Sequence, residues 1–199
     1  MDFTLVSLFV LTFTSILILP GPNAAFAVGQ SLQYGFANSI VVPLGFMLAT
    51  GIHALFIFSG IGLIIKGFPL FLLFIKWIGV CYLLLLAYKT FKNVPERLIC
   101  SPKEAPKLKM FTSAVFVSLT NPKALLASFL IYPVFISPEQ SYIVQAINLS
   151  LCAMSISFLV YASYSFFAAV MKSHLSRSKI ADRIIGAIYL GAAGILATK

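Results

Sequence analysis

The run FTLVSLFVLTFTSILILPGPNAAFAVGQSLQY, residues 3–34, is apolar and is interrupted near its middle by Pro20-Gly21-Pro22-Asn23. No Asp, Glu, Lys or Arg occurs from Phe3 to Ile65, a distance longer than the roughly 20 residues that one helix needs to cross a bilayer. A proline inside a helix removes an amide donor and clashes with the preceding turn, so the helix ends there and restarts with Pro22 in its first position. This run therefore predicts a broken transmembrane helix.

The composition of the whole chain agrees with a membrane protein. Its 199 residues are 60% hydrophobic and 10% charged, with a mean hydropathy of +1.02, whereas soluble domains usually contain about 25% charged residues. At roughly 20 residues per crossing, this length holds about six helices and no separate soluble domain. Open strands cannot cross lipid, so we expect an all-α membrane protein. The expected helical stretches are residues 3–34, 38–65, 70–91, 109–135, 141–171 and 182–198.

The basic residues predict the orientation of these helices. The net charge of +9 comes from residues between apolar runs, which favours contact with lipid headgroups over nucleic acid. A polar linker, residues 92–108, separates the halves 1–91 and 109–199 of a single transmembrane domain. We expect the linker and the last connection to be cytoplasmic and both termini to lie outside. The basic residues of these two connections are Lys89, Lys92, Arg97, Lys103, Lys107, Lys109, Lys172, Arg177, Lys179 and Arg183.

An odd number of helices in each half would invert the second half relative to the first, as in many secondary transporters. A second break, Thr120-Asn121-Pro122-Lys123, lies in the second half of the chain. Its Pro122 comes 100 residues after Pro22. A weaker similarity relates Ile78-Gly79-x-x-Tyr82-Leu83 to Ile185-Gly186-x-x-Tyr189-Leu190. The sequence therefore predicts two inverted three-helix repeats whose first helices are both broken.

Each break predicts a site for a polar or anionic ligand. Gly21 and Asn121 can occupy the N-cap positions before Pro22 and Pro122. The restarted helices expose free amides and partial positive charge at membrane depth, which suits a carboxylate. The alternative interpretation is a pair of packing kinks, which are common in membrane helices.

Away from the ends of the apolar runs, three side chains can carry charge, namely His53, Lys76 and Lys123. His53 follows Gly45 and Ala49 at four-residue steps, so it lies on a stripe of small residues that should pack against another helix. Its imidazole is a candidate for proton coupling or is a hydrogen-bonded packing residue. Lys76 can extend toward the membrane surface.

Lys123 follows Pro122 directly, where a cation has the wrong sign for the helix dipole. We therefore expect Lys123 to bind a carboxylate, with carbonyls freed at the breaks holding an ammonium group of the same ligand. The alternative is that Lys123 reaches the membrane surface or an internal cluster of carbonyls. Tyr82 and Tyr161 offer supporting hydroxyls at membrane depth.

Several motifs together resemble the LysE/RhtB family of bacterial amino-acid exporters. They are Pro20-Gly21-Pro22-Asn23, Gly45 to His53, Lys76-Trp77-Ile78-Gly79-x-x-Tyr82-Leu83 and Asn121-Pro122-Lys123-Ala124. The resemblance implies a six-helix protein of the bacterial inner membrane that exports small amino acids or their derivatives with the proton motive force. It assigns the family's motif positions to Pro20, Gly21, Pro22, Asn23, His53, Asn121, Pro122 and Lys123.

Apart from Asp182, the first residue of the last run, the membrane runs contain no carboxylate, which argues against a dibasic substrate and favours neutral amino acids such as homoserine, threonine or leucine. We expect substrate, protons and lipid as partners, and no nucleic acid; the sequence leaves homodimer formation open. No cofactor and no metal site is expected.

Three other function classes compete with an amino-acid exporter. An enzyme would need a nucleophile with a base or paired carboxylates at membrane depth, and the sequence offers neither. A thiol-reductant carrier is an alternative within the same broad superfamily, but its cysteines should lie beside the two breaks, where this chain has Asn23 and Lys123. A cation exporter would need hard oxygen ligands such as Asp or Glu in the membrane.

Overall fold

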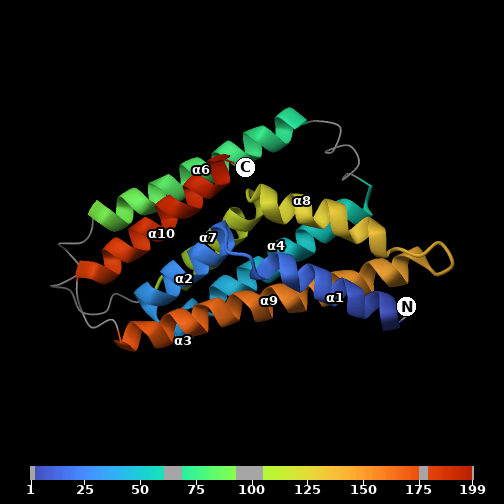
Figure 1. Cartoon of the computed structure of the whole chain (residues 1–199), viewed down its shortest axis with the longest axis horizontal. Helices are drawn as coiled ribbons and strands as arrows, with labels where there is room; N and C mark the ends of the chain where they lie inside the picture. Colours follow the sequence, from blue (N-terminus) through green and yellow to red (C-terminus); the bar gives the residue numbers. More distant parts are fainter. Residues whose placement is uncertain (1–2, 61–68, 93–104, 175–178, 199) are drawn as a thin grey trace.

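The computed structural model describes residues 3–60, 69–92, 105–174 and 179–198 (Figure 1). These described ranges contain helices and no strand. The helices of the first half are α1 (Phe3–Ile18), α2 (Pro22–Tyr34), α3 (Phe36–Ser39), α4 (Val41–Phe58) and α6 (Pro69–Lys92). Those of the second half are α7 (Lys107–Leu119), α8 (Pro122–Ile131), the 3-10 turn η2 (Tyr132–Phe135), α9 (Tyr142–His174) and α10 (Lys179–Thr198).

Both predicted helix breaks are present. α1 and α2 meet at 64°, and α7 meets the helix formed by α8 and η2 at 63°. Pro22 and Pro122 begin the restarted helices, with Gly21 and Asn121 as the N-caps. Gly21 is extended and contributes no side chain, whereas the Asn121 side chain accepts a hydrogen bond from the amide of Lys123 at 3.1 Å. The break positions and the cap residues predicted from the sequence are confirmed.

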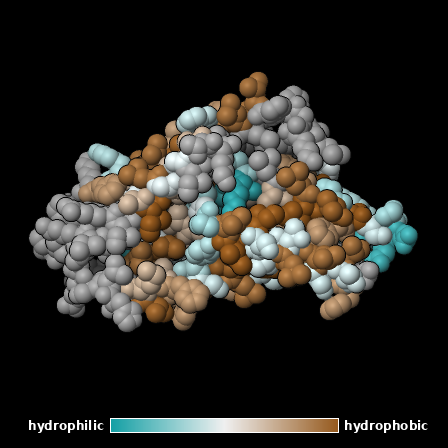
Figure 2. Space-filling model, viewed as in Figure 1, coloured by the Kyte–Doolittle hydropathy of each residue, from teal (hydrophilic) through white to brown (hydrophobic). Residues whose placement is uncertain are grey.

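The hydrophobic surface fits a protein surrounded by lipid. The helical segments 36–58 and 142–171 are each long and apolar enough to cross a membrane, and each bent pair qualifies when it is taken as one span. Figure 2 shows that the coloured part of this face is largely hydrophobic. Hydrophilic residues appear near its centre and at one end, which is the end of the connection before α9 in Figure 1. The described residues thus give two to four candidate spans, and the roles of α6 and α10 as further spans remain a prediction.

α2 occupies the centre of the bundle. Ten of its 13 residues are buried, and α7, α9 and α10 pack around it. Four of these buried residues are Ala24, Ala25, Ala27 and Gly29, whose small size lets the neighbouring helices approach closely. α6 and α10 lie side by side along one flank (Figure 1).

The predicted stripe of small residues on α4 packs against α7. A Cβ added at Gly45 would lie 2.7 Å from the Phe111 carbonyl oxygen and 2.9 Å from the Ala114 Cβ. Only glycine permits this approach without a shift of the two backbones. Ala49 is fully buried one turn later, and His53 follows it on the same side. The close packing of this stripe is therefore confirmed, and it fixes the position of His53.

Candidate functional site

The two helix breaks meet in the interior of the bundle. Asn121 Nδ2 donates to Asn23 Oδ1 at 2.9 Å, and Asn23 Nδ2 donates to the Ser118 hydroxyl at 3.1 Å. All three side chains are buried. Because Asn23 is the second residue of α2 and Asn121 caps α8, these bonds connect the two restarted helices directly.

The carbonyl groups freed at the end of α1 have protein partners. Lys123 Nζ donates to the Leu19 carbonyl oxygen at 2.5 Å, and the Tyr164 hydroxyl donates to the Ile18 carbonyl oxygen at 2.5 Å. The lysine cation therefore lies at the negative end of α1 as well as at the first turn of α8. An internal carbonyl partner for Lys123 was the alternative that the sequence left open.

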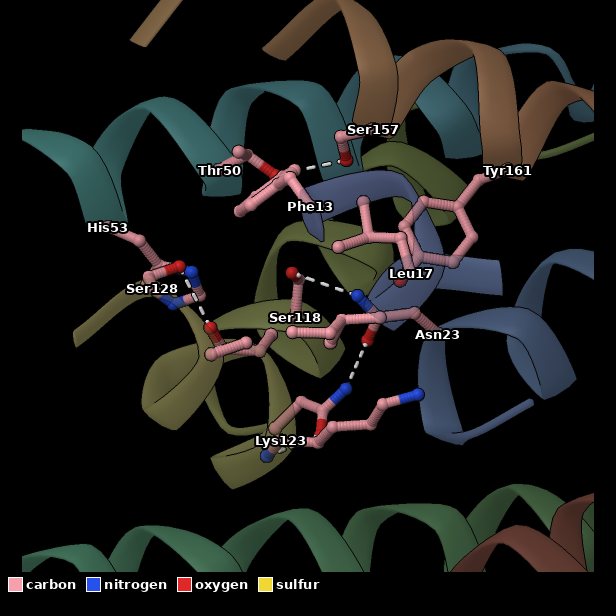
Figure 3. Close-up of a pocket in the computed structure, with 14 residues that line it drawn as sticks. Phe13, Leu17, Asn23, Thr50, His53, Ser118, Lys123, Ser128, Ser157 and Tyr161 are labelled. Carbon is pink, nitrogen blue, oxygen red and sulfur yellow. Dashed lines mark hydrogen bonds between the residues drawn. The ribbon is translucent and has the colours of Figure 1, made fainter. Parts of the chain in front are cut away.

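A narrow cavity of about 20 Å³ lies at this junction. It has room for about one water molecule, so a larger ligand would need the lining side chains to move apart. Figure 3 shows side chains from α1, α2, α4, α7, α8 and α9 converging on it. The lining residues are Phe13, Ile16, Leu17, Asn23, Thr50, His53, Ser118, Asn121, Lys123, Ala124, Ala127, Ser128, Ser157 and Tyr161.

One wall of the cavity is formed by polar side chains of α4 and α9. Thr50 Oγ1 lies 3.0 Å from Ser157 Oγ and also bonds to the Phe46 carbonyl oxygen at 2.9 Å. His53 lies almost one turn after Thr50 on the same face of α4 and is 3% exposed. Its Nε2 atom has no hydrogen-bond partner in the described part of the chain.

Apolar residues form the remaining surface. α1 contributes the large side chains Phe13, Ile16 and Leu17, and α8 contributes the small Ala124 and Ala127. The cavity therefore combines hydrogen-bonding groups with hydrocarbon. No Asp or Glu is among the lining residues that the structure describes.

Two aromatic clusters border the cavity. One cluster joins Phe9, Phe13, Phe58, Tyr132 and Phe135, with ring centroids 5.1–6.0 Å apart in the contacting pairs. The other joins Phe26, Phe46, Tyr161 and Tyr189, with centroids 4.7–6.3 Å apart. Phe13 and Tyr161 belong to these clusters and also line the cavity, so each cluster contributes one ring to its wall.

The predicted site residues divide into three groups. Asn23, His53, Asn121, Lys123 and Tyr161 line the cavity together. Pro20, Gly21, Pro22 and Pro122 shape the breaks beside it without contributing to its described lining, although a Cβ added at Gly21 would lie 3.7 Å from Lys123 Nζ.

Tyr82 lies outside that lining, half-buried, with its ring centroid 5.1 Å from that of Phe116. The Lys76 side chain lies outside the described residues, as does most of the linker 92–108.

Sequence reasoning missed the hydroxyl residues Thr50, Ser118, Ser128 and Ser157. Spacing alone contained a weak signal for two of them, since Thr50 precedes His53 by three positions and Ser157 precedes Tyr161 by four.

The cysteines and metal ligands do not form a second site in the structure's described ranges. Cys81 and Cys152 are free and lie outside the cavity lining, and Cys100 lies outside the described residues. The residues described contain no group of three or more His, Cys, Asp or Glu side chains placed to hold a metal.

Comparison with known proteins gives one consistent result. The family model for LysE type translocators matches residues 14–199. The homoserine/homoserine lactone efflux protein of Salmonella typhimurium is 23% identical over 194 residues, which cover 96% of this chain and 94% of the relative. The leucine efflux protein of Klebsiella pneumoniae is 26% identical over 190 residues, covering 92% and 90%. An uncharacterized membrane protein of Pseudomonas aeruginosa is 29% identical over 203 residues, covering 96% and 93%. No solved structure matches.

Proposed function

Because this chain belongs to the LysE type translocator family, we propose that it is a secondary transporter that exports small neutral amino acids or their derivatives across the bacterial inner membrane, coupled to protons. The relatives named for homoserine, homoserine lactone and leucine efflux support this substrate class. The homoserine-related and leucine substrates differ in side-chain polarity, so the class we propose is defined by a neutral side chain of modest size.

One observation carries this proposal, namely the cavity between the two helix breaks. Asn23, Asn121 and Lys123 from the breaks line it together with His53 from α4 and with hydrocarbon from α1 and α8. A zwitterion with a neutral side chain matches this distribution. The absence of an acidic side chain from the described lining disfavours a substrate with a second positive charge.

The start of α2 is the best position for the substrate's carboxylate. No described side chain caps it, whereas Asn121 already caps α8. The first-turn amides of α2 have no intrahelical acceptor, and helix N-termini attract anions. Lys123 adds positive charge beside Gly21. Pro20, Gly21, Pro22, Asn23, Asn121, Pro122 and Lys123 together form this part of the proposed binding site.

We further propose six transmembrane helices in two inverted repeats, with halves 1–91 and 109–199, the linker 92–108 in the cytoplasm and both termini outside. The nearly equal bends of 64° and 63° support the relation between α1–α2 and α7–α8. The packing of α6 against α10 supports the relation between the third helix of each half. In this arrangement alternating access would open the two aromatic clusters in turn.

Export assays would test the proposed function. Cells that express the chain are loaded with dipeptides, and the amino acids released into the medium are profiled against an empty-vector strain. Faster release of neutral amino acids, abolished by collapse of the proton gradient, is the expected result. A variant with all three cysteines replaced should export normally, and its complete loss of activity would instead favour a thiol-reductant carrier.

A further inference from the structure

Two carbonyl groups at the end of α1 already accept hydrogen bonds. The Ile18 carbonyl accepts from Tyr164, and the Leu19 carbonyl accepts from Lys123. Lys123 places its own cation at that end of α1, so a second cation there would be repelled. Another wall of the cavity therefore suits the ammonium better than this end of α1.

His53 provides a suitable acceptor. Three buried side-chain atoms lack a hydrogen-bond partner in the described part of the chain, and His53 Nε2 is the one of them that belongs to a residue lining the cavity. A neutral imidazole with its proton on Nδ1 presents Nε2 as an acceptor. A buried acceptor without a partner is unfavourable, so a ligand that donates to it gains affinity.

Two hydroxyl groups complete the same wall. When Thr50 Oγ1 donates to the Phe46 carbonyl oxygen, it accepts from Ser157 Oγ, which lies 3.0 Å away. A hydroxyl oxygen has two lone pairs, so each of the two oxygens still has at least one for a further donor. Figure 3 shows Thr50 and His53 extending from α4 and Ser157 from α9. An ammonium group has three N–H donors, which is the number of acceptors on this wall.

We propose that His53 Nε2, together with the Thr50 and Ser157 hydroxyls, binds the α-ammonium of the transported amino acid. This inference rests on the proposed function and fixes the orientation of the substrate within the same cavity. The carboxylate then faces the start of α2, and the side chain lies against Leu17 and Ala127.

Binding to the purified protein tests this orientation. The probes are L-leucine and L-homoserine, each compared with the analogue in which a hydroxyl replaces the ammonium. We expect the wild type to bind each amino acid about ten- to a hundredfold more tightly than its hydroxy acid, because hydrogen bonds to a charged donor are the stronger ones. In His53→Phe, which keeps a ring but removes the acceptor, this ratio should fall toward one. His53→Gln retains an acceptor and should restore part of the ratio.

Controls separate folding from binding. Tyr82→Phe removes a hydroxyl outside the described cavity lining and should leave the ratio unchanged. If His53→Phe does not fold, Thr50→Val and Ser157→Ala are measured in its place. Each should lower the ratio of amino-acid to hydroxy-acid affinity several-fold. An unchanged ratio in the folded variants would overturn the inference while leaving the proposed function intact. Failure of the wild type to bind either amino acid would overturn both.

Discussion

The Asn121 side chain donates a 2.9 Å hydrogen bond to Asn23 Oδ1, joining residues 98 positions apart at the two helix breaks. Asn121 also caps α8 through its Oδ1 atom, and Asn23 also donates to Ser118. Each amide thus uses one of its two N–H groups and one of its oxygen lone pairs within the protein. This arrangement indicates that the two asparagines hold the breaks together.

Asn121→Ser should separate these two roles of Asn121. Serine is also a good N-cap, so α8 keeps its start, but the shorter side chain cannot reach Asn23. We expect the free energy of unfolding, measured by denaturant titration in detergent, to fall by about 1 kcal/mol. Asn148→Ser, on the exposed face of α9, is the matched control and should change little. Equal stabilities of the two variants would show that the Asn121–Asn23 bond adds nothing.

Lys123→Met should weaken binding of every transported amino acid by removing positive charge near the start of α2. An amidated analogue lacks the carboxylate, so its binding should hardly change. Lys109→Met, at an exposed position of α7, serves as the control for loss of one positive charge. Equal losses of affinity for the free acid and its amide would show that Lys123 does not bind the carboxylate and acts only as the donor to the Leu19 carbonyl.

His53→Gln should flatten the dependence of export on pH while the protein still inserts into the membrane. Of the three titratable residues in the described lining, His53, Lys123 and Tyr161, only a histidine ordinarily changes charge near neutral pH. The measurement is the initial rate of export from proteoliposomes across a pH series. If the variant keeps the pH profile of the wild type, proton coupling depends on another group.

The fold followed from local covalent effects and hydrophobic length, whereas the site depended on contacts between distant segments. Pro22 and Pro122 end helices whatever surrounds them, so the breaks could be located to the residue. By contrast, Ser118 resembles the many serines that bond to their own helix backbone, and nothing in its local sequence distinguishes it. The bond from Lys123 to Leu19 spans 104 positions and is equally invisible to local patterns.

Cysteine labelling should place both basic connections in the cytoplasm. In a chain without its own cysteines, Ser101→Cys and Ser176→Cys should react with a permeant reagent and resist an impermeant one applied to intact cells. Disruption of the cells should expose both positions to the impermeant reagent. Labelling of either position from outside would reverse the orientation proposed for that connection.

Gly45→Ala should destabilise the protein, because α4 and α7 are in backbone contact at this residue. The added Cβ would lie 2.7 Å from the Phe111 carbonyl oxygen, so the helices must separate at a cost of about 1–3 kcal/mol. Gly191→Ala is the matched control, since a Cβ there meets no atom within 4 Å among the described residues, and alanine favours a helix by up to about 1 kcal/mol. Detergent denaturation of both variants measures the difference. Because His53 lies two turns along the same face of α4, Gly45→Ala should also lower the rate of transport. If Gly45→Ala is as stable and as active as Gly191→Ala, the close packing of α4 on α7 is contradicted.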